Sequence, residues 1–335
     1  MLILRKRAYA RAGLLGNPSD GYNGKTISLI VRNFWAETVL YEWDKVEIML
    51  SDHDRASFRS VHELNQDVQL HGYYGGIRLI KATIKRFVDH CQARSIELHD
   101  RNFSIRYSTN IPSNVGLAGS SAIITATLRC LMDFYHVDIP IIAQPSLVLS
   151  VETEELGISA GLQDRVVQCY EGLIYMDFDQ SYARDVEGVV AYRYEPLSTE
   201  WIPPFYIAYH TQLGEPTELF HNDIRGRYNR GEPQVIEAMQ RFADLAAQGR
   251  DALIDRDVAC LDSLINRNFE LRRGLYRLPD WQVRMIDVAR SCGASAKFAG
   301  SGGAIVGLVH DEDMLCRLRQ RMKEIGCSVI LPQII

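Results

Sequence analysis

A loop rich in glycine and serine spans Pro112 to Ala122, between a strand-like stretch and an amphipathic helix-like stretch. Glycines let a ligand approach the backbone closely, and the following helix start offers unpaired N–H groups and a positive dipole end. Such a loop can bind phosphate. Taken alone, a helix capped by serine is the commoner explanation. The loop matches neither G-x-x-x-x-G-K-[ST] nor G-x-G-x-x-G, which excludes an ordinary P-loop and weakens a dinucleotide interpretation.

Two carboxylates, Glu152 and Asp164, flank a second loop that is bounded by glycines. Phosphoryl transfer needs a ligand for the metal ion on the phosphates and a group that accepts or orients the proton of the acceptor hydroxyl. This pair can supply both. Taken alone, the two residues are more often a solvated helix end and a charge at a helix start.

Two further segments combine glycines with polar groups. The segment Arg11 to Asp20 contains an arginine, a glycine and a short polar run that ends in aspartate. The turn Gly300 to Gly303 lies between apolar runs, where a tight hairpin is the usual explanation.

Strand-like and helix-like patterns alternate along the chain and must position these segments. β-branched and aromatic residues predict a strand over 26–40. Apolar stripes and glycine stops predict helices over 75–91, 120–135 and 161–170. Shorter strands are predicted over 103–107 and 173–178.

The prolines of segment 196–204 predict a junction between a domain over 1–200 and a domain over 201–335. The pattern beyond the junction indicates an α+β fold. Its predicted elements are a strand over 205–209, a strand-turn-strand over 297–309, a helix over 311–325 and a strand near 328–331.

Composition excludes several classes of protein. The 335 residues carry a net charge of −5, which argues against a nucleic-acid partner. The uncharged stretch 107–128 is too polar for a membrane helix, and the N-terminus does not have the pattern of a secretory signal. Seven cysteines without a C-x-x-C pair predict reduced thiols and a cytoplasmic location, and the histidines lack zinc-ligand spacing.

Together and in this order, the four segments resemble the motifs of the GHMP kinases, and Glu152 to Asp164 is similar to the galactokinase form E-x-x-x-x-G-x-x-x-G-x-x-D. Within the family, the resemblance to the plant-type glucuronokinases covers essentially the whole chain. It implies a two-domain α+β GHMP kinase fold, with a ribosomal S5 domain 2-like N-terminal domain and a ferredoxin-like C-terminal domain. It also implies a sugar 1-kinase that uses ATP and Mg²⁺. The stretches that carry it are 7–11, 13–20, 72–76, 110–112, 116–122, 160–165 and 300–304.

The resemblance implies a role for each matching residue. Asp164 would accept or orient the proton of the sugar hydroxyl, and Arg11 would stabilise the charge that develops on the phosphoryl group. Ser120 and Glu152 would hold Mg²⁺. The inserted Ala118 leaves open whether the serine is Ser120 or Ser121. The residues expected to contact the nucleotide are Pro112, Gly116, Leu117, Ala118, Gly119, Ser120, Ser121 and Gly302.

The sugar is expected to contact Asp20, Asn17, Gly300 and Ser301. Arginine suits the carboxylate of a sugar acid, and proximity along the chain makes Arg165 and Lys25 the candidates, although structural ion pairs explain both equally well. Tyr73 and Tyr74 either contact the nucleotide base or pack in the core.

Three alternatives remain beside a glucuronate 1-kinase. One is a sugar 1-kinase for galacturonate, galactose or fucose, and another is a non-catalytic sugar sensor with the same fold. A Rossmann-type oxidoreductase is disfavoured because no G-x-G-x-x-G follows a first strand. The oligomeric state is left open.

Overall fold

The computed structural model describes residues 2–49, 75–213 and 218–334. The first sheet has six strands in the order β3-β4-β2-β5-β8, with β1 paired to β2. β1 runs antiparallel along one edge of β2, and β4 and β5 pair with different halves of the other edge. The strands are β1 (Ile3–Leu15), β2 (Lys25–Trp43), β3 (Glu47–Ile48), β4 (Asn102–Thr109), β5 (Leu173–Asp177) and β8 (Arg193–Leu197).

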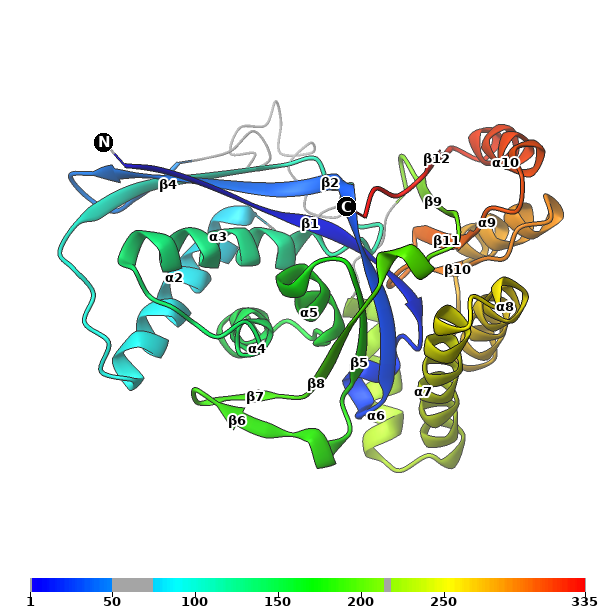
Figure 1. The fold of residues 1–335 in the computed structure, drawn as a ribbon, viewed down its shortest axis with the longest axis horizontal. Coiled ribbons are helices and arrows are strands. Elements are labelled where there is room, and N and C mark those ends of the chain that lie inside the picture. The colour runs from blue at the N-terminus through cyan, green and yellow to red at the C-terminus, as the bar shows by residue number, and fades with distance from the viewer. Residues whose placement is uncertain (1, 50–74, 214–217, 335) are drawn as a thin grey trace, which may run out of the picture.

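Four helices lie on one face of this sheet, beneath it in Figure 1. They are α2 (Gly76–Ala93), α3 (Gly119–Tyr135), α4 (Gln144–Ser150) and α5 (Gln163–Tyr170). α3 buries Ile124, Leu128 and Leu131 against the sheet core. A hairpin of β6 (Arg184–Val186) and β7 (Val189–Ala191) lies beyond α4 in Figure 1. The short helical turns of the described residues are η1 (Ser19–Tyr22), η2 (Val151–Glu155), η3 (Gln180–Tyr182) and η4 (Thr199–Trp201).

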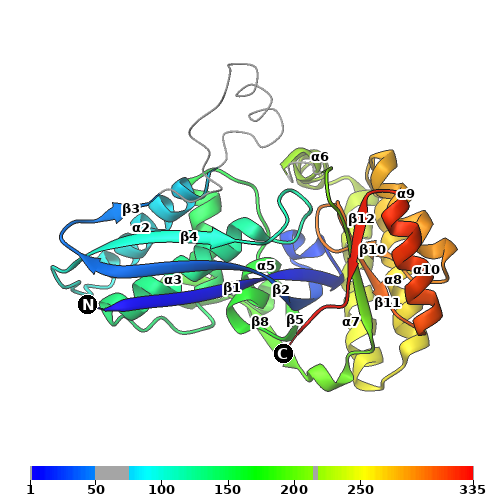
Figure 2. The same ribbon diagram turned by 90° about the horizontal axis from the view of Figure 1, so that it is seen from above.

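The second sheet has four antiparallel strands in the order β10-β11-β9-β12. They are β9 (Phe205–His210), β10 (Lys297–Phe298), β11 (Ala304–Leu308) and β12 (Cys327–Ile330). Numbered along the chain, this order is 4-1-3-2, which is the ferredoxin-like arrangement that the sequence predicts. The predicted domain boundary falls in the connection between β8 and β9. The helices are α6 (Glu218–Asn229), α7 (Pro233–Ile254), α8 (Val258–Leu275), α9 (Asp280–Ser291) and α10 (Glu312–Glu324), and Figure 2 shows α8, α9 and α10 at the end of the molecule opposite the N-terminus.

Helix α7 joins the two halves by packing against the first sheet. A Cβ on Gly249 of α7 would lie 2.1 Å from a methyl carbon of Leu15, so only glycine permits this approach. None of the helices in the described ranges combines the length and the apolar character that crossing a bilayer requires.

The predicted elements are observed, but their bounds differ in places, and several observed elements, including α4, β8 and the β6–β7 hairpin, were not predicted. The third predicted helix begins only at Gln163, because Gly161 belongs to a loop that Asp20 approaches: a Cβ on Gly161 would lie 2.1 Å from Oδ2 of Asp20. The strand β1 was not predicted, since the run Arg5 to Arg7 interrupts its apolar pattern.

Candidate active site

The four segments that the sequence singles out meet where β1, the loop before α3, the start of α5 and the β10–β11 turn come together. The backbone N–H of Gly13 donates to the carbonyl of Ala299 at 2.7 Å, and the N–H of Arg11 donates to the carbonyl of Leu117 at 3.3 Å. Residues almost 300 positions apart in the sequence therefore share one cluster.

Arg11 and Asp164 form the centre of this cluster. The guanidinium of Arg11 donates from Nε to Oδ1 of Asp164 at 2.6 Å and from a terminal nitrogen to Oδ2 at 2.8 Å. Its other terminal nitrogen donates to the carbonyls of Gly116 at 2.6 Å and Ala299 at 3.1 Å. A guanidinium has five N–H donors, so these four bonds leave one donor for an anionic group.

Glu152 is held on the opposite side of Asp164. Its Oε2 accepts from Nε of Arg165 at 3.0 Å and from a terminal nitrogen of the same side chain, while Arg165 also lies 3.4 Å from Oδ2 of Asp164. The carboxylate is 2% exposed because α4 continues into the single π-helical turn η2, which turns Glu152 inward. Such turns are frequent at functional sites.

The two serines that are candidates for the metal have different surroundings. Ser120 donates from Oγ to Oε1 of Glu152 at 2.8 Å, whereas Oγ of Ser121 donates to the carbonyl of Ala118 at 3.3 Å and is fully buried. The inserted Ala118 fits in the left-handed conformation, with φ of 63°. Ser120 therefore faces the acidic residue, and Ser121 has a structural bond.

The start of α3 keeps its anion-binding capacity. Ala118 stands at the N-cap, and no side chain caps the helix. The serine-cap explanation therefore does not apply here. The first N–H groups of this 17-residue helix therefore lie next to the loop that contains Gly116. Together with the helix dipole, they favour an anion at this position.

The turn between β10 and β11 closes against this loop. A Cβ on Gly300 would lie 2.1 Å from the carbonyl oxygen of Gly116, and a Cβ on Gly116 would lie 2.8 Å from both N and Oγ of Ser301. A Cβ on Gly302 would lie 2.4 Å from Oε1 of Gln282. Glycine is thus required on both sides of the contact.

Two buried cations that the sequence did not reveal hold the turn in place. Arg272 of α8 donates to the carbonyls of Gly300 at 2.9 Å and Ser301 at 3.0 Å. Lys297 of β10 donates from Nζ to the carbonyl of Gly13 at 2.7 Å and to Oδ1 of Asn17 at 2.6 Å. In the sequence, Lys297 stands alone between apolar residues just before the glycine turn, and this pattern could have indicated a buried lysine.

Asp20 and Asn17, both in the segment Arg11 to Asp20, lie beside this cluster. Oδ2 of Asp20 accepts from the backbone N–H of Gln163 at 3.3 Å, which places it next to Asp164. Asn17 is buried, and the Oδ1 atom of its side-chain amide accepts a hydrogen bond from Nζ of Lys297.

The two aspartates differ in acidity. Burial, and then the negative charge of Asp164, raise the pKa of Asp20 to about 6, against smaller opposing effects of Gln163 and the nearby guanidinium groups. Burial also pushes the pKa of Asp164 upward, but Arg11, Arg165 and a hydrogen bond from the Gln163 side chain outweigh it and leave that pKa below its usual value. Asp164 is therefore ionised at neutral pH, whereas Asp20 takes up a proton in mildly acidic solution.

The remaining predicted site residues are distributed as follows. Lys25 pairs with Asp177 at 3.8 Å and has no ion pair with the cluster within the described ranges. Leu117 directs its side chain into the core and contributes its carbonyl, and Pro112 is half-buried at the start of the loop. Tyr73 and Tyr74 lie outside the described residues.

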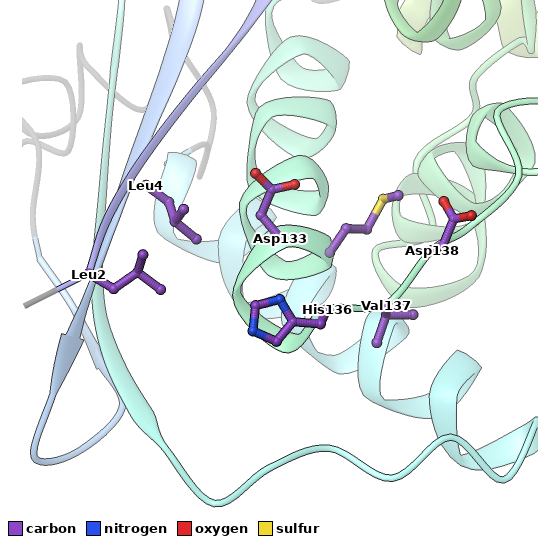
Figure 3. A pocket seen from close by; sticks show the side chains of 7 residues that line it. Leu2, Leu4, Asp133, His136, Val137 and Asp138 are labelled. Carbon is purple, nitrogen blue, oxygen red and sulfur yellow. The ribbon is translucent and has the colours of Figure 1, made fainter.

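A separate pocket lies at the other end of α3 (Figure 3), far along the helix from Ser120. None of the predicted site residues lines it. Its lining residues are Leu2, Leu4, Met132, Asp133, His136, Val137 and Asp138.

Comparison with solved structures places this arrangement in a known fold. The chain superposes on a Lin0012 protein from Listeria innocua with a TM-score of 0.80 over 99% of this chain and 98% of that one, at 15% identity. It superposes on Lactococcus lactis galactokinase complexed with galactose with a TM-score of 0.75 over 99% and 93% of the two chains, at 14% identity. At these identities the likeness concerns the fold alone.

Sequence comparison is more specific. The chain is 42% identical to "Glucuronokinase 1" of Arabidopsis thaliana over 309 residues, which are 90% of this chain and 84% of that protein. The family model of the GHMP kinases N terminal domain matches residues 78–172, which include the loop before α3 and both Glu152 and Asp164. The model of the GHMP kinases C terminal domain matches residues 250–326, which include the closing turn. With both domain matches, a close full-length relative and the shared fold, the chain belongs to the GHMP kinase family.

Proposed function

We propose that this protein is a glucuronokinase, which transfers the terminal phosphoryl group of ATP to the anomeric hydroxyl of D-glucuronate and releases ADP and D-glucuronate 1-phosphate. One observation carries the proposal: a continuous chain of contacts joins Arg11, Asp164, Glu152 and Ser120 in a protein that is 42% identical to an Arabidopsis glucuronokinase. A sugar sensor has no need of this set of charges.

The phosphates of ATP bind at the loop and the uncapped start of α3, between Gly116 and Ser121. Backbone N–H groups and the helix dipole favour negative charge there. The turn from Gly300 to Gly302 closes over the same loop from the second sheet, as its contacts with Gly116 indicate.

The residues present fit a magnesium ion. Adjacent ligands of an octahedral Mg²⁺, each about 2.0–2.1 Å from the metal, lie about 2.9 Å from each other. Oγ of Ser120 and Oε1 of Glu152 are 2.8 Å apart, so both can serve as neighbouring ligands. Water and phosphate oxygens complete such a site. The ion supplies charge that offsets the negative charge of the phosphates during transfer.

The remaining roles follow from the contacts of the two aspartates. Asp164, fixed by Arg11, accepts a hydrogen bond from the anomeric hydroxyl and orients it towards the phosphoryl group. A strong base is unnecessary, because the transition state of phosphoryl transfer is largely dissociative and depends on positioning. The fifth N–H of Arg11 stabilises the transferred group, and Asp20 and Asn17 bind the sugar. We also propose a cytoplasmic location, because all seven cysteines are free thiols.

A coupled assay of ADP release with ATP and Mg²⁺ tests the proposal over a panel of sugars. We expect robust turnover of glucuronate and weaker turnover of galacturonate, galactose and fucose. Robust turnover of a neutral hexose, with none of any uronate, would reject the proposed acceptor.

A further inference from the structure

A glucuronate site must provide a cation for the sugar carboxylate, and this inference rests on the proposed function. Two guanidinium groups near Asp164 are already committed to protein carboxylates. Arg11 pairs with Asp164, and Arg165 pairs with Glu152 and is 5% exposed in its side chain. Each guanidinium therefore already neutralises a buried carboxylate, and the one remaining N–H of Arg11 is assigned to the transferred phosphoryl group.

The buried cations of the second domain are also occupied. Lys297 donates to three protein oxygens. Arg272 donates to two carbonyls of the β10–β11 turn and lies over the rings of Tyr276 and Phe298, at 5.0 and 5.3 Å. Both hold the turn rather than face a ligand.

Arg225 of α6 differs from all of these. Its guanidinium carbon lies 4.4 Å from the ring centroid of Tyr22, and a terminal nitrogen lies 2.8 Å from the position that a Cβ on Gly21 would take. Both neighbours directly follow Asp20 in η1. Among the side chains that the structure describes, no carboxylate pairs with Arg225, although Arg227 of the same helix and Arg230, just after its end, both pair with Glu232.

An unpartnered hydroxyl lies in the same place. The hydroxyl of Tyr276 is buried and has no hydrogen-bond partner among the described residues. The Tyr276 side chain belongs to the same buried cluster as Tyr22, and Arg272 lies over its ring. A buried hydroxyl without a partner is costly, and a polar ligand in this place would satisfy it.

We infer that Arg225 binds the carboxylate of the sugar acid and makes the site selective for a uronate. Asp20 contacts Gln163, beside Asp164, on one side and directly precedes the Gly21–Tyr22 pair under Arg225 on the other. A pyranose whose anomeric hydroxyl faces Asp164 and whose ring hydroxyls face Asp20 presents its far end to Arg225. The half-buried Arg225 side chain packs over the Tyr22 ring, and its guanidinium has the geometry for paired hydrogen bonds to a carboxylate.

The test uses the variants Arg225→Gln and Arg225→Lys, with Arg230→Gln, an exposed arginine just after the end of α6, as the control. Turnover of glucuronate and glucose is measured, and binding of both sugars is measured by calorimetric titration. We expect Arg225→Gln to raise KM and Kd for glucuronate by about 10- to 100-fold, with kcat and the glucose parameters nearly unchanged. Arg225→Lys should recover part of the loss, and Arg230→Gln should match the wild-type enzyme.

Two outcomes overturn the inference alone. One is an unchanged KM and Kd for glucuronate in Arg225→Gln. The other is an equal loss with glucuronate and glucose, which indicates a structural role. A wild-type enzyme that binds and turns over no uronate overturns the proposed function first, and the inference with it.

Discussion

Arg11 contacts both carboxylate oxygens of Asp164, with Nε 2.6 Å from Oδ1 and a terminal nitrogen 2.8 Å from Oδ2. The same guanidinium reaches the loop before α3 through Gly116 and the closing turn through Ala299. This one side chain thereby fixes the position of Asp164 relative to the loop proposed to bind ATP. Asp164 is thus ionised and held by two hydrogen bonds from Arg11.

Replacing Asp164 by asparagine tests the orienting role. Asn keeps the size of the side chain but can accept at only one oxygen, so the acceptor hydroxyl loses its alignment. We expect kcat to fall by about 100- to 10,000-fold. The affinity for ATP should stay nearly intact, because the phosphate contacts come from the loop and α3. Steady-state kinetics and direct titration with ATP measure the two quantities, and a variant that keeps near wild-type turnover contradicts the mechanism.

The two neighbouring serines provide a matched pair of variants. Ser120→Ala removes the oxygen beside Glu152, and we expect the Mg²⁺ concentration for half-maximal activity to rise by roughly 10-fold or more. Ser121→Ala removes a buried bond to Ala118, so it should lower the free energy of unfolding by about 1 kcal/mol. Its Mg²⁺ dependence should be unchanged. The reverse pattern of effects would assign the metal to Ser121.

Because the pKa of Asp20 is raised, we expect activity and stability to depend on pH in opposite directions. Its pKa is raised to about 6 from 3.8, so the folded protein holds this proton more tightly than the unfolded chain. Between about pH 4 and 6 the folded state therefore binds more protons, and this contribution to stability declines as the pH rises. Binding of sugar hydroxyls needs the ionised form, so kcat/KM should increase over the same range.

The variant Asp20→Asn separates this effect from other titrations. We expect it to raise the melting temperature relative to wild type at pH 7.5 but not at pH 4, since only the ionised aspartate is destabilising. Its residual kcat/KM should lose the acidic limb near pH 6. Equal stability differences at both pH values would show that Asp20 does not titrate in this range.

The sequence predicted the features that depend on neighbouring residues. The apolar stripes located α2 and α3 to within two residues, and the order of the motifs identified the residues that meet around Asp164. Features that depend on distant pairing were missed. Lys297 and Asn17 are 280 positions apart, and nothing local marks either as the partner of the other.

The contact between Arg225 and Tyr22 was missed for the same reason. Arg225, Arg227 and Arg230 are close together in the sequence, and only the fold shows that Arg227 and Arg230 pair with Glu232 while Arg225 packs on Tyr22. The choice between Ser120 and Ser121 likewise required the left-handed conformation of Ala118, which no propensity predicts for alanine.

The last prediction concerns the contact between the closing turn and the phosphate loop. A Cβ on Gly300 would lie 2.1 Å from the carbonyl oxygen of Gly116 and 2.9 Å from a terminal nitrogen of Arg11. Gly300→Ala must therefore displace the turn or the guanidinium. We expect kcat/KM to fall by about 100-fold, because displacements of an ångström have this effect on positioned groups.

Gly274→Ala is the matched control, because no atom lies within 4 Å of its added Cβ and the residue belongs to α8. Alanine is more favourable than glycine in a helix by about 0.5–1 kcal/mol, so this variant should be at least as stable as wild type and fully active. Circular dichroism establishes that both variants are folded. A folded Gly300→Ala with wild-type kinetics would mean that the turn can retreat from Gly116 without affecting the chemistry, and that closure of the two segments is not required for phosphoryl transfer.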